Sequence, residues 1–408
     1  MGDELLPLNW KKVALKDTTE IIMGQSPPSE TYNIEGKGYP FLQGKADFSE
    51  RYPKPTKWCT KPLKVAEGGS ILISVRAPVG DVNLADQNYI IGRGLCSIRF
   101  NKNYDNEFLF YCLMYNKKRI ESQGSGTTFQ SINKATLDNF TILFPPLPEQ
   151  RAIARALRAV QAAREARLRE ITLERERKAA LMEHLFTHGT RGEPTKMTEI
   201  GEMPEGWKTP KLADLAEIQS GGTPLRNHHE YYNGSINWAK TLDLNDGIVR
   251  STEEKITDLG FHSIRGKIRP IDTVMVAMYG GSGTVGKSGI LGIPAATNQA
   301  VCCIEPNFER FDSLYLLYYL IHFRPNWMRY AIGTRKDPNI SKGIIESLKI
   351  PLPPLGQQKE ISRTIKACDT KITALGQEAC LLDELFRAML EELMTGRQRA
   401  GALVSDKS

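Results

Sequence analysis

The sequence predicts an α+β protein with two similar domains and two long helices. The first observation is an internal repeat, because residues 6–28 and 203–225 align at a constant offset of 197 with nine identities over 21 positions. A second block, 145–155 against 353–363, shares six residues at an offset of 208. A helical run of about 40 residues follows each copy of that block. A shared period indicates a duplicated unit. The two repeats are similar at their ends and divergent in their middles, which indicates two related domains.

Each repeat has the same order of elements. It opens with a tryptophan, Trp10 or Trp207, which we expect to pack in the core. A Gly-x-Ser/Thr-Pro turn, short strands, a helix and a last strand that ends in a proline pair then follow. The expected strands include 70–75, 95–100, 273–279 and 300–304, and the expected helices are 107–122 and 313–330.

Two long helices are predicted at 149–188 and 357–395, because neither run contains proline and only Gly376 interrupts the second. At ~1.5 Å per residue each helix would span roughly 60 Å. In the second run, apolar residues recur mostly at steps of three, four and seven, which is typical of a coiled coil. These residues are Ile361, Ile365, Cys368, Ile372, Leu375, Leu382, Leu385 and Met389. Residues 189–206 have Gly, Pro and Thr but no apolar period, which predicts a linker.

Composition narrows the class of protein. The 408 residues are 40% hydrophobic and 25% charged, which excludes wholesale disorder. No apolar run is long enough to cross a membrane, and the N-terminus lacks the pattern of a signal peptide. Seven cysteines without a Cys-x-x-Cys pair disfavour a disulfide framework or a structural zinc site, so we expect a cytoplasmic protein. The net charge of +7 permits a nucleic-acid partner without requiring one.

One segment, 281–288, matches the phosphate-loop pattern G-x-x-x-x-G-K-[ST] and follows a strand-like run. A nucleotide hydrolase needs a helix directly after Lys287 and Ser288, because the helix N-terminus helps to hold the phosphates. Two glycines and a proline in the next six positions disfavour that helix. A glycine-rich loop between two strands is the preferred interpretation. No other catalytic constellation and no metal-spaced histidine cluster is found, so no catalytic or metal-binding residue is predicted.

Basic and amide side chains in the divergent middles are candidates for DNA contact. Arg, Lys, Asn and Gln recognise base edges, and Lys and Arg also hold phosphates. A wider set of loop residues includes Arg51 and Arg269. The candidate DNA-binding residues are Gln43, Lys45, Arg76, Arg93, Gln130 and Lys134 in the first repeat, and Lys240, Lys287, Asn298, Gln299, Arg335 and Lys336 in the second.

Three sets of residues support a resemblance to a known family. They are the two Trp-x-x-x-x-Leu-x-Asp openings, the Gly-x-Ser/Thr-Pro turns, and 145–154 with its counterpart 353–362. Together they resemble the specificity subunits of Type I restriction–modification systems over nearly the whole chain. The second copy departs from the first at Gly356 and Gln357, which weakens that motif but not the architecture. The residues of the openings are Trp10, Leu15 and Asp17, and Trp207, Leu212 and Asp214.

The resemblance implies two target-recognition domains, each a mostly antiparallel curved sheet with short helices, separated by two long antiparallel coiled-coil helices. The expected boundaries are 1–147 for the first domain, 148–188 for the first long helix, 189–206 for the linker, 207–354 for the second domain, 355–396 for the second long helix and 397–408 for the tail.

The resemblance also implies a function. The chain would be the non-catalytic DNA-recognition subunit of the complex, with one domain for each half of a bipartite, asymmetric target. Its partners would be double-stranded DNA, two methyltransferase subunits and, where present, restriction and translocase subunits. It would bind no cofactor, since S-adenosylmethionine, and ATP with Mg, would belong to those partners. Two alternatives are a nucleotide hydrolase that uses 281–288 and a coiled-coil scaffold with two non-DNA binding modules.

Overall fold

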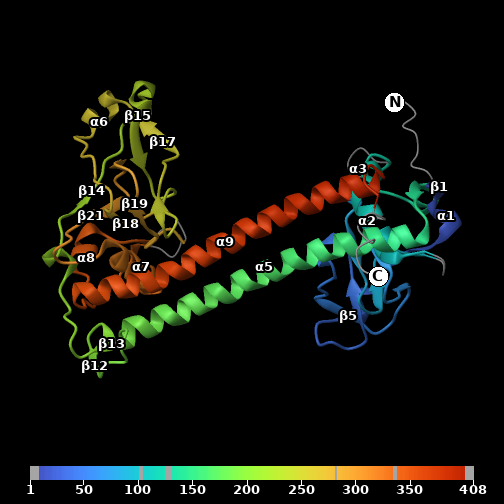
Figure 1. Cartoon of the computed structure of the whole chain (residues 1–408), viewed down its shortest axis with the longest axis horizontal. Helices are drawn as coiled ribbons and strands as arrows, with labels where there is room; N and C mark the ends of the chain where they lie inside the picture. Colours follow the sequence, from blue (N-terminus) through green and yellow to red (C-terminus); the bar gives the residue numbers. More distant parts are fainter. Residues whose placement is uncertain (1–8, 101–103, 125–130, 281–282, 334–337, 400–408) are drawn as a thin grey trace. The chain divides into compact units, whose positions relative to one another are not determined.

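Figure 1 shows the computed structural model, which describes residues 9–100, 104–124, 131–280, 283–333 and 338–399. The chain divides into two compact units. Unit 1 consists of Met1–Leu168 and Gln377–Ser408, and unit 2 consists of Arg169–Gly376. No helix in the described part of the chain is long and apolar enough to cross a membrane.

Unit 1 contains two main sheets. The first is antiparallel with the order β2-β10-β7-β8, and the second has the order β3-β5-β4-β9-β6, in which β4 and β9 are parallel. β7 is buried along its whole length, which explains its continuous apolar sequence. A further pair joins β1 to β11. The strands are β1 (Lys11–Ala14), β2 (Thr19–Met23), β3 (Tyr32–Asn33), β4 (Tyr39–Leu42), β5 (Lys57–Cys59), β6 (Val65–Ala66), β7 (Ile71–Ser74), β8 (Val82–Leu84), β9 (Tyr89–Ile91), β10 (Leu95–Phe100) and β11 (Thr141–Phe144).

Unit 2 repeats this topology. Its larger sheet has the order β14-β21-β18-β19-β16, and the smaller has the order β17-β15-β20. Four of these strands, β14, β21, β18 and β19, correspond to β2, β10, β7 and β8, and the parallel pair β15–β20 corresponds to β4–β9. The predicted α+β class with two similar, mostly antiparallel domains is therefore confirmed. The strands are β12 (Thr195–Thr198), β13 (Gly201–Pro204), β14 (Ile218–Ser220), β15 (Tyr232–Ala239), β16 (Ile248–Val249), β17 (Glu254–Ile256), β18 (Val274–Ala277), β19 (Ser288–Leu291), β20 (Ala296–Thr297), β21 (Val301–Ile304), β22 (Ile332–Gly333) and β23 (Pro338–Asn339).

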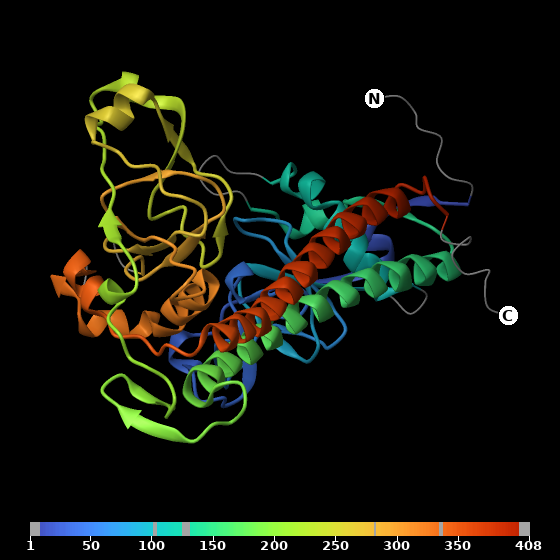
Figure 2. The same ribbon diagram turned by 60° about the vertical axis from the view of Figure 1, so that its left-hand side comes forward.

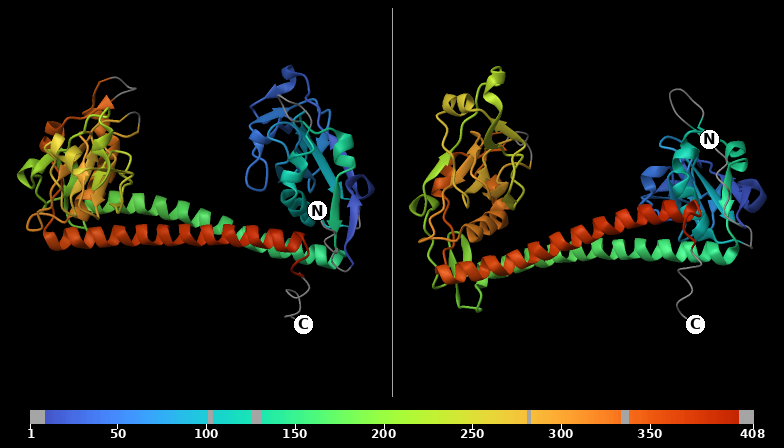
Figure 3. Two further views of the ribbon diagram at one scale, coloured as in Figure 1. Left: turned by 90° about the horizontal axis from the view of Figure 1, so that it is seen from above. Right: turned by 45° about the horizontal axis from the view of Figure 1, so that its top comes forward.

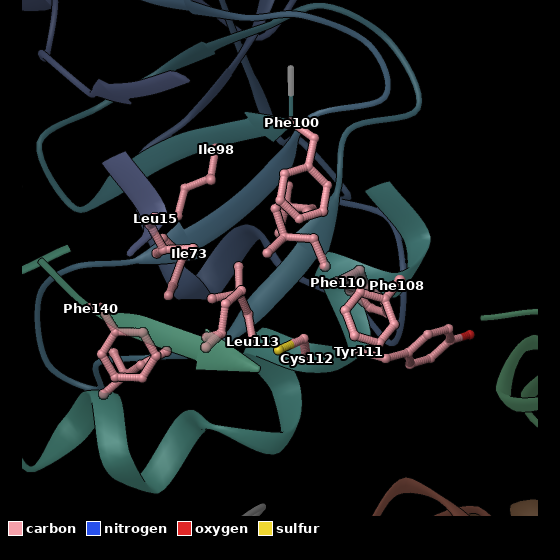
Figure 4. Packing of buried hydrophobic residues seen from close by; sticks show 14 of the residues in the cluster. Leu15, Ile73, Ile98, Phe100, Phe108, Phe110, Tyr111, Cys112, Leu113 and Phe140 are labelled. Carbon is pink, nitrogen blue, oxygen red and sulfur yellow. The ribbon is translucent and has the colours of Figure 1, made fainter. Parts of the chain in front are cut away.

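The core of unit 1 packs α2 against the four-stranded sheet. Ile73, Ile98 and Phe108 are fully buried in one cluster, which Figure 4 shows from close by. The Asp105 side chain caps α2 by accepting a hydrogen bond from the Phe108 amide (2.9 Å). The predicted helix 107–122 is in fact two helices that meet at Asn116. The helices are α1 (Leu15–Thr18), α2 (Asn106–Tyr115), α3 (Lys117–Glu121) and α4 (Lys134–Asp138), with 3₁₀ turns η1 (Ser29–Thr31) and η2 (Lys45–Asp47).

The core of unit 2 packs α7 against the larger sheet, where Leu316 lies in one cluster with Val274 and Ile290. The predicted helix 313–330 ends early as an α-helix because Pro325 cannot supply the backbone N–H that would continue it. A 3₁₀ segment completes the run. The elements are η3 (Leu212–Asp214), η4 (His229–Tyr231), α6 (Asp258–Ser263), α7 (Ser313–Phe323), η5 (Arg324–Arg329) and α8 (Lys342–Ser347).

The repeated tryptophans attach each domain to a long helix, α5 (Leu147–His188) or α9 (Leu355–Met394). The Trp10 indole donates to Glu149 Oε2 (3.2 Å), and the Trp207 indole donates to Gln357 Oε1 (3.1 Å). An amide oxygen thus replaces a carboxylate oxygen as the acceptor. The departure of the second copy at Gln357 therefore preserves the contact.

The repeated glutamines complete the same joint. The Gln150 side chain accepts from the Asp105 amide (3.1 Å) and donates to the Pro145 carbonyl (2.9 Å). Gln358 does the same with the Asp312 amide and the Pro353 carbonyl, both at 2.8 Å. Both glutamines are 1% exposed. These bonds fix the first turn of each long helix to the loop that leads into α2 or α7.

The two long helices run antiparallel within each unit (Figure 3). In unit 1, Arg164 pairs with Asp383 (3.3 Å) and Arg167 with Glu378 (2.6 Å). In unit 2, Lys178 pairs with Asp369 (2.5 Å) and Glu174 with Lys371 (3.3 Å). In each pair of contacts, the residue number falls on one helix as it rises on the other.

The predicted apolar seam of α9 is confirmed except at Leu385. Ile361, Ile365, Cys368 and Leu375 are all buried. Leu385 was predicted to lie in the seam, but 47% of it is exposed. Leu385 is ten residues after Leu375 on the same helix. At about 100° per residue, its side chain lies about 80° around the helix from that of Leu375. The predicted seam residues Leu382 and Met389 are half-buried, and the seam also includes the buried Ala379 and the half-buried Phe386.

The segment 189–206, predicted as a linker, contains a hairpin formed by β12 and β13 (Figure 2). Met203 in β13 is 1% exposed and joins the core of unit 2. Met197 in β12 is 78% exposed. Two adjacent buried side chains, Met203 and Pro204, in a polar, turn-rich segment give no apolar period, so the sequence pattern did not indicate the hairpin.

Candidate nucleic-acid interface

Backbone hydrogen bonds bring four loops of unit 1 together. The Gly92 amide donates to the Leu42 carbonyl (2.8 Å), the Val75 amide to the Gly94 carbonyl (2.9 Å), and the Ile132 amide to the Val75 carbonyl (2.9 Å). These bonds connect the loops that follow β4 and β7, the loop between β9 and β10, and the segment before α4. We call this region the loop edge of unit 1.

The described candidates of the first repeat gather on this edge, and all are exposed. Gln43 accepts a hydrogen bond from Lys57 (3.0 Å). Lys45 pairs with Asp81 (3.0 Å), and Lys134, in the first turn of α4, pairs with Asp138 (2.9 Å). Arg76 and Arg93 have no acidic partner among the described residues. Two exposed guanidinium groups are therefore available to a ligand.

Unit 2 has an equivalent loop edge. The Asn298 amide donates to the Ala239 carbonyl (2.9 Å), the Met278 amide to the Ala300 carbonyl (2.8 Å), and the Ile340 amide to the Met278 carbonyl (2.9 Å). The same backbone bonds thus join the same four loops in both repeats. The equivalent edges therefore define a shared frame.

The candidates of the second repeat differ in their availability. Lys240 is 12% exposed and contacts both Glu253 (3.0 Å) and Glu254, so its charge is neutralised inside the domain. Lys287 and Asn298 are half-buried, and Gln299 is exposed. The Asn298 Oδ1 atom is buried and has no hydrogen-bond partner in the described part of unit 2. Three candidates, Gln130, Arg335 and Lys336, lie outside the described residues.

The repeated Gly-x-Ser/Thr-Pro turns position these loops, a role that the sequence did not reveal. The Gly24 amide donates to the Leu95 carbonyl (2.9 Å), and a Cβ on Gly24 would lie 2.2 Å from the Gly92 carbonyl oxygen. A Cβ on Gly221 would lie 1.9 Å from the Thr297 carbonyl oxygen. Only glycine permits so close an approach of the turn to the loop edge. The repetition of this glycine at an offset of 197 was the available signal.

Two basic residues of the wider set are structural. Arg51 is 3% exposed and contacts Glu107, Tyr111 (3.1 Å) and Gln161 (3.2 Å). Arg269 is also 3% exposed and pairs with Glu305 (2.5 Å). Both are therefore removed from the candidate interface.

The phosphate-loop interpretation of 281–288 is wrong. Ser288 begins strand β19, which pairs antiparallel with β18, where a nucleotide site would need a helix. Gly286 has φ +76°, and a Cβ there would lie 2.1 Å from Trp327 Cδ1. Gly286 thus serves a tight turn packed on a tryptophan, in agreement with the preferred loop interpretation. Among the described residues, no three His, Cys, Asp or Glu side chains are grouped to hold a metal ion.

The family model described as the Type I restriction modification DNA specificity domain matches residues 7–174 and again 204–380. The chain belongs to this family. The two matches correspond to the two repeats, and the class of the protein is that of the non-catalytic specificity subunits.

Two relatives come from Methanocaldococcus jannaschii. The chain is 52% identical over 158 residues to a putative type I restriction enzyme MjaX specificity subunit, a match that covers 38% of this chain and 37% of the relative. It is 26% identical over 406 residues to the MjaVIII specificity subunit, which covers 97% and 94%. A crystal structure of a Type I S subunit from M. genitalium has the same fold, with a TM-score of 0.61, 19% identity, and 95% and 98% coverage.

Proposed function

We propose that this specificity subunit recognises a bipartite, asymmetric DNA target, with residues 1–147 contacting one half-site and residues 207–354 the other. The observation that supports this most is the pair of loop edges. The backbone frame is the same in both domains, but the side chains on it differ. A protein that recognises two different half-sites needs such a shared frame with different side chains on it.

Equivalent positions on the two edges have different recognition chemistry. Gln43 is exposed after β4, whereas Lys240 at the equivalent place after β15 is paired with two glutamates. Arg76 follows Val75 at the place where Tyr279 follows Met278. Arginine forms bidentate hydrogen bonds with guanine, and glutamine does so with adenine. We therefore expect the domains to prefer different bases at equivalent places.

The partners follow from the same proposal. The chain would dock two methyltransferase subunits and, where present, restriction and translocase subunits, in the cytoplasm. It would hold no cofactor of its own, so that S-adenosylmethionine, ATP and Mg would be bound by those partners. A second structure of the same fold, with a TM-score of 0.61, concerns complex assembly of the type I R-M system, which supports an assembled state for this class of protein.

A binding measurement tests the proposal at one edge. The complex of this chain with its methyltransferase should bind a target duplex, and Arg93→Ala should weaken that binding by roughly 5–150-fold, equivalent to about 1–3 kcal/mol. The control is Lys12→Ala, because Lys12 is also exposed but lies on β1, which pairs with the strand leading to α5. Equal effects of both variants on binding would refute recognition through the loop edge.

A further inference from the structure

The second repeated block and the helical turn that follows it contain residues that the fold does not use. Gln150 and Gln358 make the helix joints, and Ile153 and Ile361 are fully buried. The basic positions have no such role, although three of them match at an offset of 208. We name Arg151, Arg155 and Arg158 stripe 1, and Lys359, Arg363 and Lys366 stripe 2.

Each stripe lies on one face of a long helix. Its positions are 140–200° around the helix from Ile153 or Ile361, at about 100° per residue, and so face away from the core. Arg151, Arg155, Lys359, Arg363 and Lys366 are all exposed, and Arg158 is half-buried. A groove of about 550 Å³ adjoins stripe 1, and one of about 490 Å³ adjoins stripe 2. Both repeats therefore have a groove beside the equivalent basic residues.

The positive charges of the stripes are mostly unpaired. Arg158 pairs with Glu165 (3.2 Å), but none of the other five has an acidic partner in the described part of the chain. Arg155 and Arg363 each donate only to a carbonyl of their own helix, at 3.3 and 3.2 Å.

The acidic groups that line the grooves are already engaged. Asp105 and Asp312 cap α2 and α7, and Glu107 pairs with the buried Arg51. The stripes therefore present excess positive charge to an external partner.

Stripe 1 is remote from the loop edge of unit 1. Leu95, at the start of β10, bonds to the loop edge, whereas Phe100, at its end, bonds to Asn106 at the start of α2. Asp105, which lines the groove of stripe 1, lies at this second end. Six strand residues, about 20 Å, therefore separate the two regions. DNA bound at the loop edge would not require phosphate contacts at the opposite end of the same sheet.

We propose that the two stripes are equivalent docking surfaces, each for an acidic segment of one methyltransferase copy. This inference rests on the proposed function. Two copies of one partner present the same surface twice, so they require the same recognition residues twice on this chain. Repeated, unpaired cations at matched positions meet that requirement. The occupant is an acidic protein surface because charge complementarity selects the partner and steers its approach.

Charge reversal tests the proposal in the full complex, with the number of methyltransferase copies measured by native mass spectrometry. The wild-type chain should bind two copies. Arg151→Glu with Arg155→Glu should weaken one copy at least about tenfold, and Lys359→Glu with Arg363→Glu should weaken the other. All four substitutions together should remove both copies. Arg175→Glu, at another exposed position of α5, is the matched control and should retain two.

The outcomes separate this inference from the proposed function. If the wild-type chain binds no methyltransferase, the proposed function itself is refuted. If it binds two copies and both stripe variants also bind two with unchanged affinity, only the docking surfaces are refuted. A stripe variant that keeps both copies but loses affinity for duplex DNA would assign the stripes to phosphate contact and overturn the proposal. Circular dichroism of each variant should match the wild type, since the substituted side chains are exposed.

Discussion

Gln150 and Gln358 are the residues on which the attachment of each domain to its helix most depends. Gln150 makes two hydrogen bonds with the backbone and Gln358 makes three, and both side chains are buried. Burial makes an unpaired polar group costly, because no water replaces the lost partner. These two side chains are therefore local determinants of how the fold holds together.

Gln358→Leu should destabilise unit 2. The change leaves the Asp312 amide and the Pro353 carbonyl without their partner, which should cost about 2–4 kcal/mol. Urea unfolding followed by tryptophan fluorescence measures the loss. Gln377→Leu is the matched control on α9, because Gln377 is exposed. Equal stability of the two variants would contradict the assigned role of Gln358.

Glu174 should make the stability of unit 2 depend on pH. Hydrogen bonds from Arg177, with help from Lys371, lower the pKa of Glu174 from 4.5 to about 2 against the opposing effect of burial. A carboxylate with a lowered pKa stabilises the folded state fully above pH 4.5, and this contribution is lost as the pH falls toward 2. The melting temperature of Glu174→Gln should therefore differ most from the wild type above pH 4.5. Glu176→Gln, at an exposed site, is the control. A difference that stays constant from pH 2 to 7 would disprove the assignment.

The charged residues show where prediction from sequence reaches its limit. The sequence identified the loops that meet at the loop edges, since Gln43, Arg76, Arg93 and Gln299 lie there as exposed side chains. It could not separate them from Lys240, whose charge is neutralised by two glutamates. The acid that pairs with a cation can be distant in the chain. Glu107, for example, is 56 residues from Arg51.

At the scale of elements, the helix pair is held by an apolar seam with salt bridges beside it. The seam was predictable at most positions, Leu382 and Met389 included, because regular spacing of apolar residues follows directly from helix geometry. Near its end the sequence offers Leu385 and Phe386 as neighbouring apolar residues, and Leu385 was assigned to the seam where Phe386 belongs. Only the placement of the partner helix decides between them.

Leu375→Asp should disrupt the helix pair, whereas Leu385→Asp should be tolerated. Leu375 is 6% exposed, so a carboxylate there would be buried without a partner and should cost at least about 3 kcal/mol. Leu385 is 47% exposed and provides a control with the same substitution on the same helix. Thermal unfolding measured by circular dichroism distinguishes the variants. A greater loss of stability in Leu385→Asp would reverse the assignment of the seam.

At the scale of the whole molecule, duplication explains both what was predictable and what was not. Repeated positions such as Trp10 and Trp207 or Gly24 and Gly221 define the frame, and the sequence identified them by their constant offset. The divergent middles contain the candidate recognition residues. Base choice there depends on how individual side chains meet DNA, which no offset or period encodes.

The proposed function requires that one chain contain two independent recognition domains. Methylation-site sequencing of a chimera is the decisive measurement. The chimera replaces residues 39–134 with the matching stretch of a related specificity subunit and is assembled with the methyltransferase. We expect one half of the methylated target to change, while the other half and the spacer stay the same, because only the loop edge of unit 1 has been exchanged. A chimera in which both half-sites change would contradict the independence of the two domains.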